Sequence, residues 1–464
     1  MGIRAGLTNL FEEAFFTDLR NREYARLNQQ GQIYLDYTGG NLYGSSQILK
    51  HKEQLLRDVF GNPHSSNPTS RRATELVDEA RQSVIDFFQA EDYVCVFTAN
   101  ASAALKIVGE GYPFDEQSSL LMLADNHNSV NGIREFCLKR KGRFKYIPVQ
   151  YEDLCIPENE LKQAISEANA EANNLLAFPA QSNVSGVKHK LSWVAYAQER
   201  GFDVLLDAAA FVPTSKLDLR KVQPDFVSVS FYKIFGYPTG IGCLLIKKDR
   251  FHKLQKPWFA GGTVNFVSVG NPSYFLASDH ERFEDGTINY LDIPAIKIGL
   301  DHISEIGIDK ISARVKSLTK ALIEQLKELK HDNGRSVVSV FGPDELEKRG
   351  GNVILNFFDP EGKPIPFWES ERLANERNIS IRSGCFCNPG IDEINNCVTA
   401  EETAKYFTSR DLGDYHKMAS MLGKMRGAVR VSVGIATTGA DLEEFCRFVE
   451  SFKNVTVDEV LARS

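Results

Sequence analysis

Residues 226–236 read Phe-Val-Ser-Val-Ser-Phe-Tyr-Lys-Ile-Phe-Gly, an apolar run that leads directly into a lysine. A second apolar run, Val204-Leu205-Leu206, lies upstream and ends at Asp207. Runs that are apolar throughout are typical of strands covered on both faces. In open α/β sheets, ligands bind beyond the carboxyl ends of such strands. These two runs therefore predict that Asp207 and Lys233 lie at a ligand site on the edge of a sheet.

Similar apolar runs occur on both sides of these two, and helical patterns lie between several of them. Repeated strand–helix–strand units indicate a mainly parallel sheet with right-handed crossovers. We therefore predict an α/β fold with a seven-stranded sheet. The predicted strands are Tyr93–Thr98, Leu120–Ala124, Phe144–Val149, Leu175–Pro179, Val204–Asp207, Phe226–Ser230 and Gly242–Ile246. The predicted helices between them are Ala103–Gly109, Val130–Lys139, Glu158–Ala168 and Ser192–Glu199.

The pattern changes after Asp292, where long helices and fewer strands follow. This part predicts a smaller α+β domain with helices at Ile308–Lys330, Glu369–Asn375 and Leu442–Lys453, and strands at Val337–Phe341 and Val353–Phe358. We predict three parts of the chain: an N-terminal segment (1–43) that packs with the small domain, a large cofactor-binding domain (44–292) and the small domain (293–464).

Composition excludes several classes of protein. The chain has 464 residues, of which 42% are hydrophobic and 25% charged, as in ordinary globular proteins. Its net charge of −7 comes from interleaved acidic and basic residues, which argues against a nucleic-acid-binding surface. No apolar run reaches the roughly 20 residues of a membrane span, and the N-terminus lacks the apolar core of a signal peptide. The eight cysteines do not form a secreted disulfide pattern, so we expect a cytoplasmic protein.

Asp207 and Lys233 together suit pyridoxal 5'-phosphate (PLP). The lysine amine can form an imine with the cofactor, and a carboxylate keeps the pyridine nitrogen protonated so that the ring withdraws electrons. Taken alone, the two residues favour a simpler interpretation, a helix-capping aspartate and a solvated loop lysine. Groups at other strand ends favour the PLP hypothesis.

Three further strand ends carry compatible groups. Ala101 and Ser102 open a helix directly after a strand, and free N–H groups at a helix start bind anions such as a phosphate. His127 follows the next strand, where an imidazole can stack on a pyridine ring and move protons. Asn183 follows another, where its amide can donate to a phenolate-type oxygen. Five strand ends thus converge on the chemistry of one cofactor.

The order of these residues resembles the class V aminotransferases, which include the cysteine desulfurases. The sequence is most similar to the desulfurase-like domain of molybdenum cofactor sulfurases, from about residue 30 to 450. The matching motifs are residues 34–36 (YLD), 61–65 (GNPHS), 230–240 (SFYKIFGYPTG), 261–264 (GGTV), 282–287 (RFEDGT) and 382–390 (RSGCFCNPG).

The resemblance implies the fold-type-I architecture of PLP-dependent transferases and a role for each matching residue. It implies a Schiff base on Lys233, a pyridinium partner in Asp207, a ring-stacking His127 and a ring-hydroxyl contact from Asn183. Phosphate-binding positions are Ala101, Ser102 and Ser230, and Tyr232 stands before the lysine, as in the sulfurase branch. Thr287 matches a threonine that reaches the partner subunit's phosphate, which implies a homodimer. Arg430 matches the arginine that holds the substrate α-carboxylate, with Arg382 assisting.

Cys387 matches the nucleophile of the desulfurases. In that mechanism the thiolate attacks the sulfur of the bound cysteine substrate, which leaves a persulfide and releases alanine. This requires an exposed or mobile thiol with thiolate character, which the neighbouring Arg382 would promote. Cys385 would relay sulfur or form a disulfide. A metal site at Cys385 and Cys387 is disfavoured, because only Cys397 lies near enough to add a ligand.

The sequence also departs from the family pattern. Position 210, three residues after Asp207, commonly carries Gln or His, and Ala210 removes a hydrogen bond near the ring oxygen. Sulfurases of this kind continue into a domain that delivers sulfur to the molybdenum cofactor, whereas this chain ends at Ser464, so we expect that domain to be absent or separate.

The leading hypothesis is a cysteine desulfurase that passes sulfur to an acceptor protein. One alternative is a PLP-dependent enzyme that does not use Cys387, either a lyase such as a selenocysteine lyase or a class V enzyme that acts on another amino acid. The other is a sulfur-relay protein without catalysis.

Overall fold

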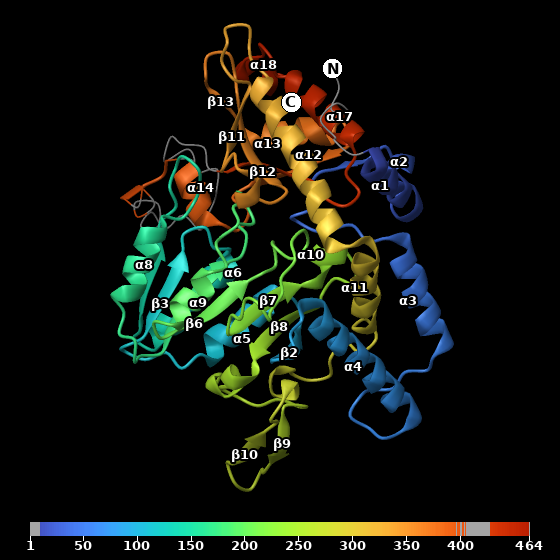
Figure 1. Ribbon diagram of the computed structural model, residues 1–464, viewed down its shortest axis with the longest axis vertical. Coiled ribbons are helices and arrows are strands. Elements are labelled where there is room, and N and C mark those ends of the chain that lie inside the picture. Colours follow the sequence, from blue (N-terminus) through green and yellow to red (C-terminus); the bar gives the residue numbers. More distant parts are fainter. Residues whose placement is uncertain (1–9, 396, 400, 403, 405–426, 464) are drawn as a thin grey trace.

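The computed structural model describes residues 10–395, 397–399, 401, 402, 404 and 427–463. A seven-stranded sheet occupies its centre (Figure 1), with the strand order β2-β8-β7-β6-β5-β3-β4. β8 runs antiparallel to both of its neighbours, and every other pairing in the sheet is parallel. The predicted α/β class and mainly parallel sheet are therefore confirmed. The strands are β2 (Tyr93–Thr98), β3 (Ser119–Leu123), β4 (Arg143–Ile147), β5 (Asn174–Pro179), β6 (Phe202–Asp207), β7 (Phe226–Ser230) and β8 (Gly242–Lys247).

All seven predicted strands are present, and their ends differ from the prediction by no more than two residues. Every residue of β5, β6 and β7 is buried, which explains why these strands read as continuous apolar runs. Helices cover the sheet on both sides (Figure 1). The helices of this part of the chain are α3 (Ser45–Arg57), α4 (Pro68–Phe88), α5 (Ala101–Gly111), α6 (Asn128–Asn131), α7 (Ile133–Lys139), α8 (Glu158–Ser166), α9 (Trp193–Gln198), α10 (Phe231–Phe235) and α11 (Pro294–Ile306).

The prediction of one helix at Val130–Lys139 was wrong. The structure has α6 and α7 instead, and Gly132 ends the first and begins the second. The periodic apolar residues of the two helices made them look like one.

A second sheet lies above the first in Figure 1, with the order β11-β12-β16-β15 and with β13 beside β12. Its neighbouring strands are antiparallel, and β16 is buried along its whole length. The strands are β11 (Val338–Phe341), β12 (Asn352–Phe358), β13 (Pro364–Ile365), β15 (Arg382–Gly384) and β16 (Ala428–Ser432). The helices of this part are α12 (Ile308–Glu328), α13 (Phe367–Asn375), α14 (Pro389–Asn395), α17 (Gly439–Glu450) and α18 (Val457–Leu461).

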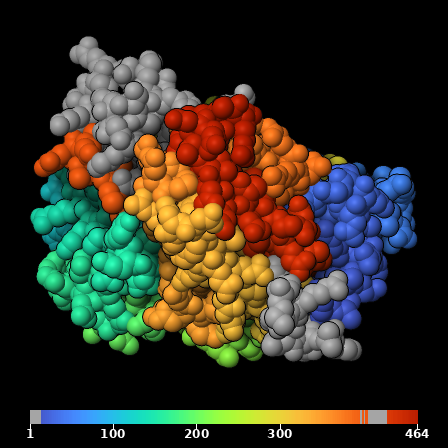
Figure 2. Space-filling model, turned by 90° about the horizontal axis from the view of Figure 1, so that it is seen from above, coloured from blue at the N-terminus to red at the C-terminus, as the bar shows by residue number. Residues whose placement is uncertain are grey.

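The N-terminal segment joins this upper part. It contains α1 (Leu10–Glu23), α2 (Arg26–Gln29) and β1 (Ile33–Tyr34), and β1 pairs in parallel with β14 (Ile379–Ser380). Arg20 and Asp441 form an ion pair of 2.6 Å in which both side chains are 7% exposed. Seen from above, the N-terminal helices lie against the C-terminal helices (Figure 2). The three domain boundaries given above stay a prediction.

A short hairpin projects from the bottom of the molecule in Figure 1. It consists of β9 (Val264–Val267) and β10 (Tyr274–Leu276), and its large apolar side chains are exposed. Three short 3₁₀ helices, Lys248–Lys253, His280–Phe283 and Leu346–Lys348, complete the described elements. Over the described ranges, none of the helices has both the length and the apolar character needed to cross a bilayer.

Candidate active site

A cavity of about 180 Å³ opens at the carboxyl ends of the parallel strands. The strand ends meet here because all strands of the sheet except β8 point the same way. Eight of the residues predicted to bind the cofactor line this cavity: Ala101, Ser102, His127, Asn183, Asp207, Ser230, Tyr232 and Lys233. The structure also places Asn100, Ser129, Gln181, Ala209 and Ala210 in its wall.

Asp207 ends β6 and is buried. One of its oxygens, Oδ1, accepts hydrogen bonds from the Ala209 N–H (3.0 Å) and the Ser228 hydroxyl (3.2 Å). The other oxygen, Oδ2, has no hydrogen-bond partner in the described part of the chain. The carboxylate is thus held in place by one oxygen and leaves the other for a ligand.

Lys233 follows β7 in the short helix α10, is half-buried and lines the cavity. Burial lowers the pKa of this amine, and the positive charges of Arg430 and Arg382 lower it further. The carboxylate of Asp207 acts in the opposite direction. The net effect brings the neutral, nucleophilic amine closer to physiological pH, as imine formation requires.

His127 caps α6, and its Nδ1 accepts a hydrogen bond from the Ser129 N–H at 3.1 Å. Since Nδ1 acts as an acceptor, the proton of the neutral ring resides on Nε2. Burial lowers the pKa of His127, while Asp207 opposes this shift. The histidine therefore presents a neutral ring with an N–H at Nε2.

The N-terminus of α5 forms the anion-binding end of the cavity. Asn100 caps the helix by accepting the Ala103 N–H at 3.0 Å, and the Ser230 hydroxyl accepts the Ala101 N–H at 2.8 Å. The Ser102 hydroxyl lies 2.5 Å from that of Ser129. Free N–H groups and hydroxyls at the start of an eleven-residue helix are a suitable cradle for a phosphate.

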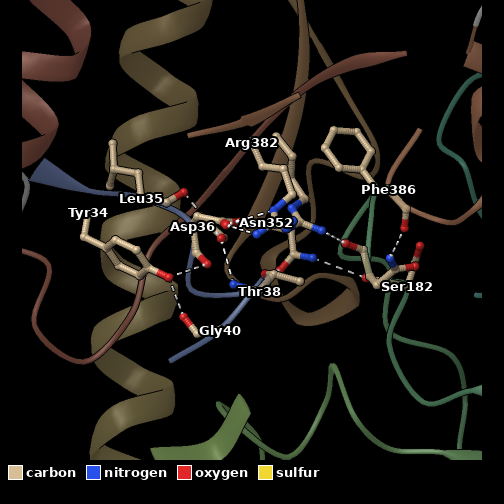
Figure 3. A network of polar contacts seen from close by, with 12 residues as sticks. Tyr34, Leu35, Asp36, Thr38, Gly40, Ser182, Asn352, Arg382 and Phe386 are labelled. Carbon is tan, nitrogen blue, oxygen red and sulfur yellow. Dashed lines mark hydrogen bonds and ion pairs between the residues drawn. The ribbon is translucent and has the colours of Figure 1, made fainter. Parts of the chain in front are cut away.

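Two arginines lie opposite each other on neighbouring strands. Arg382 of β15 pairs in register with Arg430 of β16, so both side chains project from the same face. Two like charges in this arrangement repel each other. Asp36 contacts both: it accepts from Arg382 Nε and Nη2 at 2.9 and 2.7 Å (Figure 3) and from Arg430 Nη2 at 2.8 Å.

This cluster carries one net positive charge, because two guanidinium groups surround one carboxylate. Arg430 is 3% exposed, and its Nη1 also donates to the Asn183 carbonyl at 2.8 Å. Its Nε is buried and has no partner among the described residues. A buried guanidinium with an unused donor and one uncompensated charge fits a carboxylate ligand.

The segment Cys385–Gly390 is held against the site by hydrogen bonds to three residues, Asn183, Asn128 and Asp125. The Asn183 amide donates to the Phe386 carbonyl (2.8 Å), the Asn128 N–H to the Cys387 carbonyl (2.7 Å) and the Asn388 amide to the Asp125 carbonyl (2.7 Å). Phe386 and Cys387 both have left-handed backbone angles, with φ of 57° and 55°. Non-glycine residues rarely adopt this conformation, so these hydrogen bonds fix a turn that the chain would not take by itself.

Cys387 is exposed at this turn. It lies near enough to Lys233 for its negative charge to raise the pKa of the amine. An exposed thiol is thus combined with an anchored backbone, whereas the sequence left open whether the segment would be mobile.

Thr287 is the one predicted cofactor contact that the structure does not bring to the cavity. It is exposed and lines a separate hollow beside Trp258 and Lys106. This location is compatible with its predicted role at the site of a partner subunit.

Sequence reasoning missed four residues of the site: Asp36, Gln181, Ser129 and Asn388. Asp36 belonged to a motif that carried the family resemblance, but its role was not assigned. Its partners are 346 and 394 residues away, so no local pattern could identify them. Within the described residues, no three His, Cys, Asp or Glu side chains gather in a way that could hold a metal ion.

Three features of this site together fit PLP. They are the amine of Lys233, the Asp207 carboxylate with one oxygen left unbonded, and the phosphate cradle at the start of α5. A cofactor site of this kind at the carboxyl edge of a mainly parallel sheet defines a fold-type-I PLP-dependent enzyme. The comparison with known families agrees. This chain belongs to the class-V aminotransferase family, which it matches over residues 33–445. The resemblance inferred from the sequence is thereby confirmed.

Molybdenum cofactor sulfurases are among the similar proteins. The molybdenum cofactor sulfurase of Homo sapiens is 36% identical over 456 residues, which cover 93% of this chain and 51% of that protein. The one from Arabidopsis thaliana is 33% identical over 484 residues, which cover 94% and 58%. The chain thus spans between half and three fifths of the length of these two relatives.

Solved structures of similar shape include two cysteine desulfurases. The enzyme from Thermococcus onnurineus NA1 has a TM-score of 0.77 and 25% identity, and the match covers 94% of this chain and 97% of that one. The enzyme CsdA from Escherichia coli has a TM-score of 0.74 at 18% identity, covering 94% and 98%, which shows the shared fold.

Proposed function

We propose that this protein converts L-cysteine into L-alanine and takes the sulfur as a persulfide on Cys387, from which it passes to an acceptor. The observation that carries the proposal is the turn of Cys385–Gly390, which carries an exposed thiol at Cys387 and is hydrogen-bonded to Asn183 in the wall of the cavity. The sulfurase and desulfurase relatives support the same chemistry.

Binding of the substrate falls to Arg430. Its unused donors and the net positive charge shared with Arg382 and Asp36 suit one α-carboxylate. Asp36 fixes both guanidinium groups from one side, so the carboxylate approaches from the other. The guanidinium group is planar and presents parallel N–H donors, so it is selective for carboxylates in this orientation.

PLP, when bound, withdraws electrons from the substrate and so acidifies its Cα–H bond. Lys233 Nζ, whose pKa is lowered mainly by burial, is suited to accept that proton. His127 presents Nε2–H toward the same cavity and can return a proton. Asp207 lies in the wall of the same cavity, and its negative charge acts on both His127 and Lys233.

The sulfur step needs a thiolate at Cys387. Its Sγ attacks the sulfur of the substrate, an S–S bond forms, and the bond between sulfur and Cβ breaks. The electron pair stays on the substrate carbon, which takes up a proton to become alanine. The product on the protein is a Cys387 persulfide, and a second thiol on the acceptor would remove it.

Cys387→Ser tests the proposal. We expect the variant to bind PLP normally, but to form alanine from cysteine at least roughly a thousand-fold more slowly, because no thiolate can take the sulfur. The measurement is simultaneous assay of alanine and sulfide, together with the yellow colour of the bound cofactor. Cys397→Ser is the matched control, since Cys397 is also an exposed thiol and has no proposed role.

Normal turnover by Cys387→Ser would contradict the proposal and favour a lyase or selenocysteine lyase that cleaves through the cofactor alone. A wild-type protein that binds PLP but forms no alanine would point to a different amino acid as substrate.

A homodimer is the proposed assembly. The hairpin β9–β10 exposes Phe266 and Phe275 at 64% and 70%, and Trp258 nearby is 50% exposed. Contiguous exposed apolar side chains of this size mark protein–protein interfaces. A second copy that covers them would suit the location of Thr287 outside its own cavity.

A further inference from the structure

Gln181 is a buried side chain that the mechanism above does not use. It lies two residues beyond β5, is 2% exposed and lines the cofactor cavity. Its backbone is fixed by a bridge to Lys188. The side-chain amide makes no hydrogen bond with any described residue, and its Oε1 is completely buried. Unpartnered buried amides are rare in folded proteins, because they lose their contacts with water without replacement.

The fold makes room for this amide. A Cβ on Gly350 would lie 2.2 Å from Gln181 Oε1 and 2.5 Å from Nε2, so only a glycine permits the amide to lie where it does. The Gly350 N–H is held by the Gly186 carbonyl at 2.8 Å, which keeps the glycine backbone against the amide. The packing therefore fixes an amide that has nothing to bind within the described chain.

Gln181 lies near Ala210, the position whose small side chain leaves a hydrogen bond to the cofactor unmade. Pro179 is the register partner of Asp207 across β5 and β6, and the Ala180 N–H donates to the Asp207 carbonyl at 2.8 Å. Gln181 thus leaves its strand beside the segment that leads to Ala210, and both residues line the same cavity. Position 210 is where the family commonly carries a Gln or His near the ring oxygen of the cofactor.

We propose that Gln181 replaces the side chain missing at position 210 and donates a hydrogen bond from Nε2 to the phenolic oxygen of PLP. This gives the amide's Nε2 a ligand, while Oε1 stays buried against Gly350, and it restores a polar contact that the sequence lacks at Ala210. Gly350 acts indirectly by setting the orientation of the amide. The inference depends on the cofactor and is independent of whether cysteine is the substrate.

The test compares Gln181→Leu with the wild type, with and without PLP. A donor to the phenolic oxygen stabilises its ionised form, so its loss raises the pH midpoint at which the visible absorption of the PLP-loaded protein changes. We expect a rise of about one pH unit, the tenfold change produced by losing one hydrogen bond to a charged oxygen. Adding Ala210→Gln should bring the midpoint back toward that of the wild type.

The cofactor-free protein gives a second readout. Since the amide has no partner there, Gln181→Leu should not lower the melting temperature. Gln47→Leu is the control, because Gln47 is 1% exposed and both of its amide atoms are bonded, to Gly44 (2.6 Å) and Phe235 (3.1 Å). That variant should melt at a lower temperature and keep the wild-type midpoint.

An unchanged midpoint in Gln181→Leu, with PLP bound, would overturn the inference. A lower melting temperature of the cofactor-free Gln181→Leu protein would do so as well, since the amide would then have a structural role. Neither readout depends on turnover, so a failure of this inference can be distinguished from a failure of the proposed desulfurase activity.

Discussion

Replacing Asp36 by asparagine tests how the arginine pair is held. The carboxylate accepts three hydrogen bonds from Arg382 and Arg430, whose side chains would otherwise face each other with like charges (Figure 3). Asparagine keeps the shape and one oxygen but removes the charge. The cluster would then change from one net positive charge to two.

The magnitude follows from the burial of each partner. Arg430 is 3% exposed at the side chain, and breaking a buried ion pair costs about 3–5 kcal/mol. Arg382 is 51% exposed, and pairs of that kind contribute about 0.2–1 kcal/mol. Because the asparagine oxygen still accepts one neutral hydrogen bond, we expect Asp36→Asn to lower the free energy of unfolding by about 3 kcal/mol.

Urea unfolding of the cofactor-free protein measures this loss. A double-mutant cycle with Arg382→Gln should give a coupling below about 1 kcal/mol, since that pair is half exposed. Asp36→Asn should also raise the Michaelis constant for the amino-acid substrate about tenfold, because Arg430 is no longer oriented.

Asp441→Asn is the matched control, as Asp441 pairs with the buried Arg20 outside the cavity. It should lose stability without a change in the Michaelis constant. A loss below about 1 kcal/mol for Asp36→Asn would refute the reasoning, because Arg430 would then be held without the carboxylate.

Two more predictions concern Lys233 and the hairpin. Because burial lowers the pKa of Lys233 below its ordinary 10.5, the rate of PLP capture by the cofactor-free protein should rise with pH as the amine loses its proton. Its midpoint should lie below 10.5, and stopped-flow absorbance would measure it; a midpoint at or above 10.5 would contradict the burial argument. Phe275→Asp, at a 70% exposed position of β10, should convert the proposed dimer into monomers in sedimentation experiments. A wild-type chain that is monomeric at all concentrations would exclude the dimer.

The sequence predicted the central sheet well for a physical reason. Strands buried on both faces must be apolar along their whole length, so β5, β6 and β7 could be recognised without knowledge of their neighbours. The grouping of His127 and Lys233 could also be predicted, because each of them follows an apolar strand. Parallel strands bring their carboxyl ends to one edge, whatever their order in the sheet.

Local patterns gave less information where two elements follow closely. The break at Gly132 between α6 and α7 was invisible, since the apolar spacing continues through it. The anchoring of Cys387 was also out of reach, because its hydrogen bonds come from segments near residues 128 and 183.

The sequence by itself therefore determined the fold class, the cofactor and the residues at the strand ends, since each of these depends on an apolar strand and the polar residue that follows it. Only the tertiary structure decided how Asp36 joins Arg382 and Arg430, and why Gln181 is left with an amide that binds nothing in the described chain. Such contacts join residues that are distant in the chain and depend on packing, which leaves no periodic trace in the sequence.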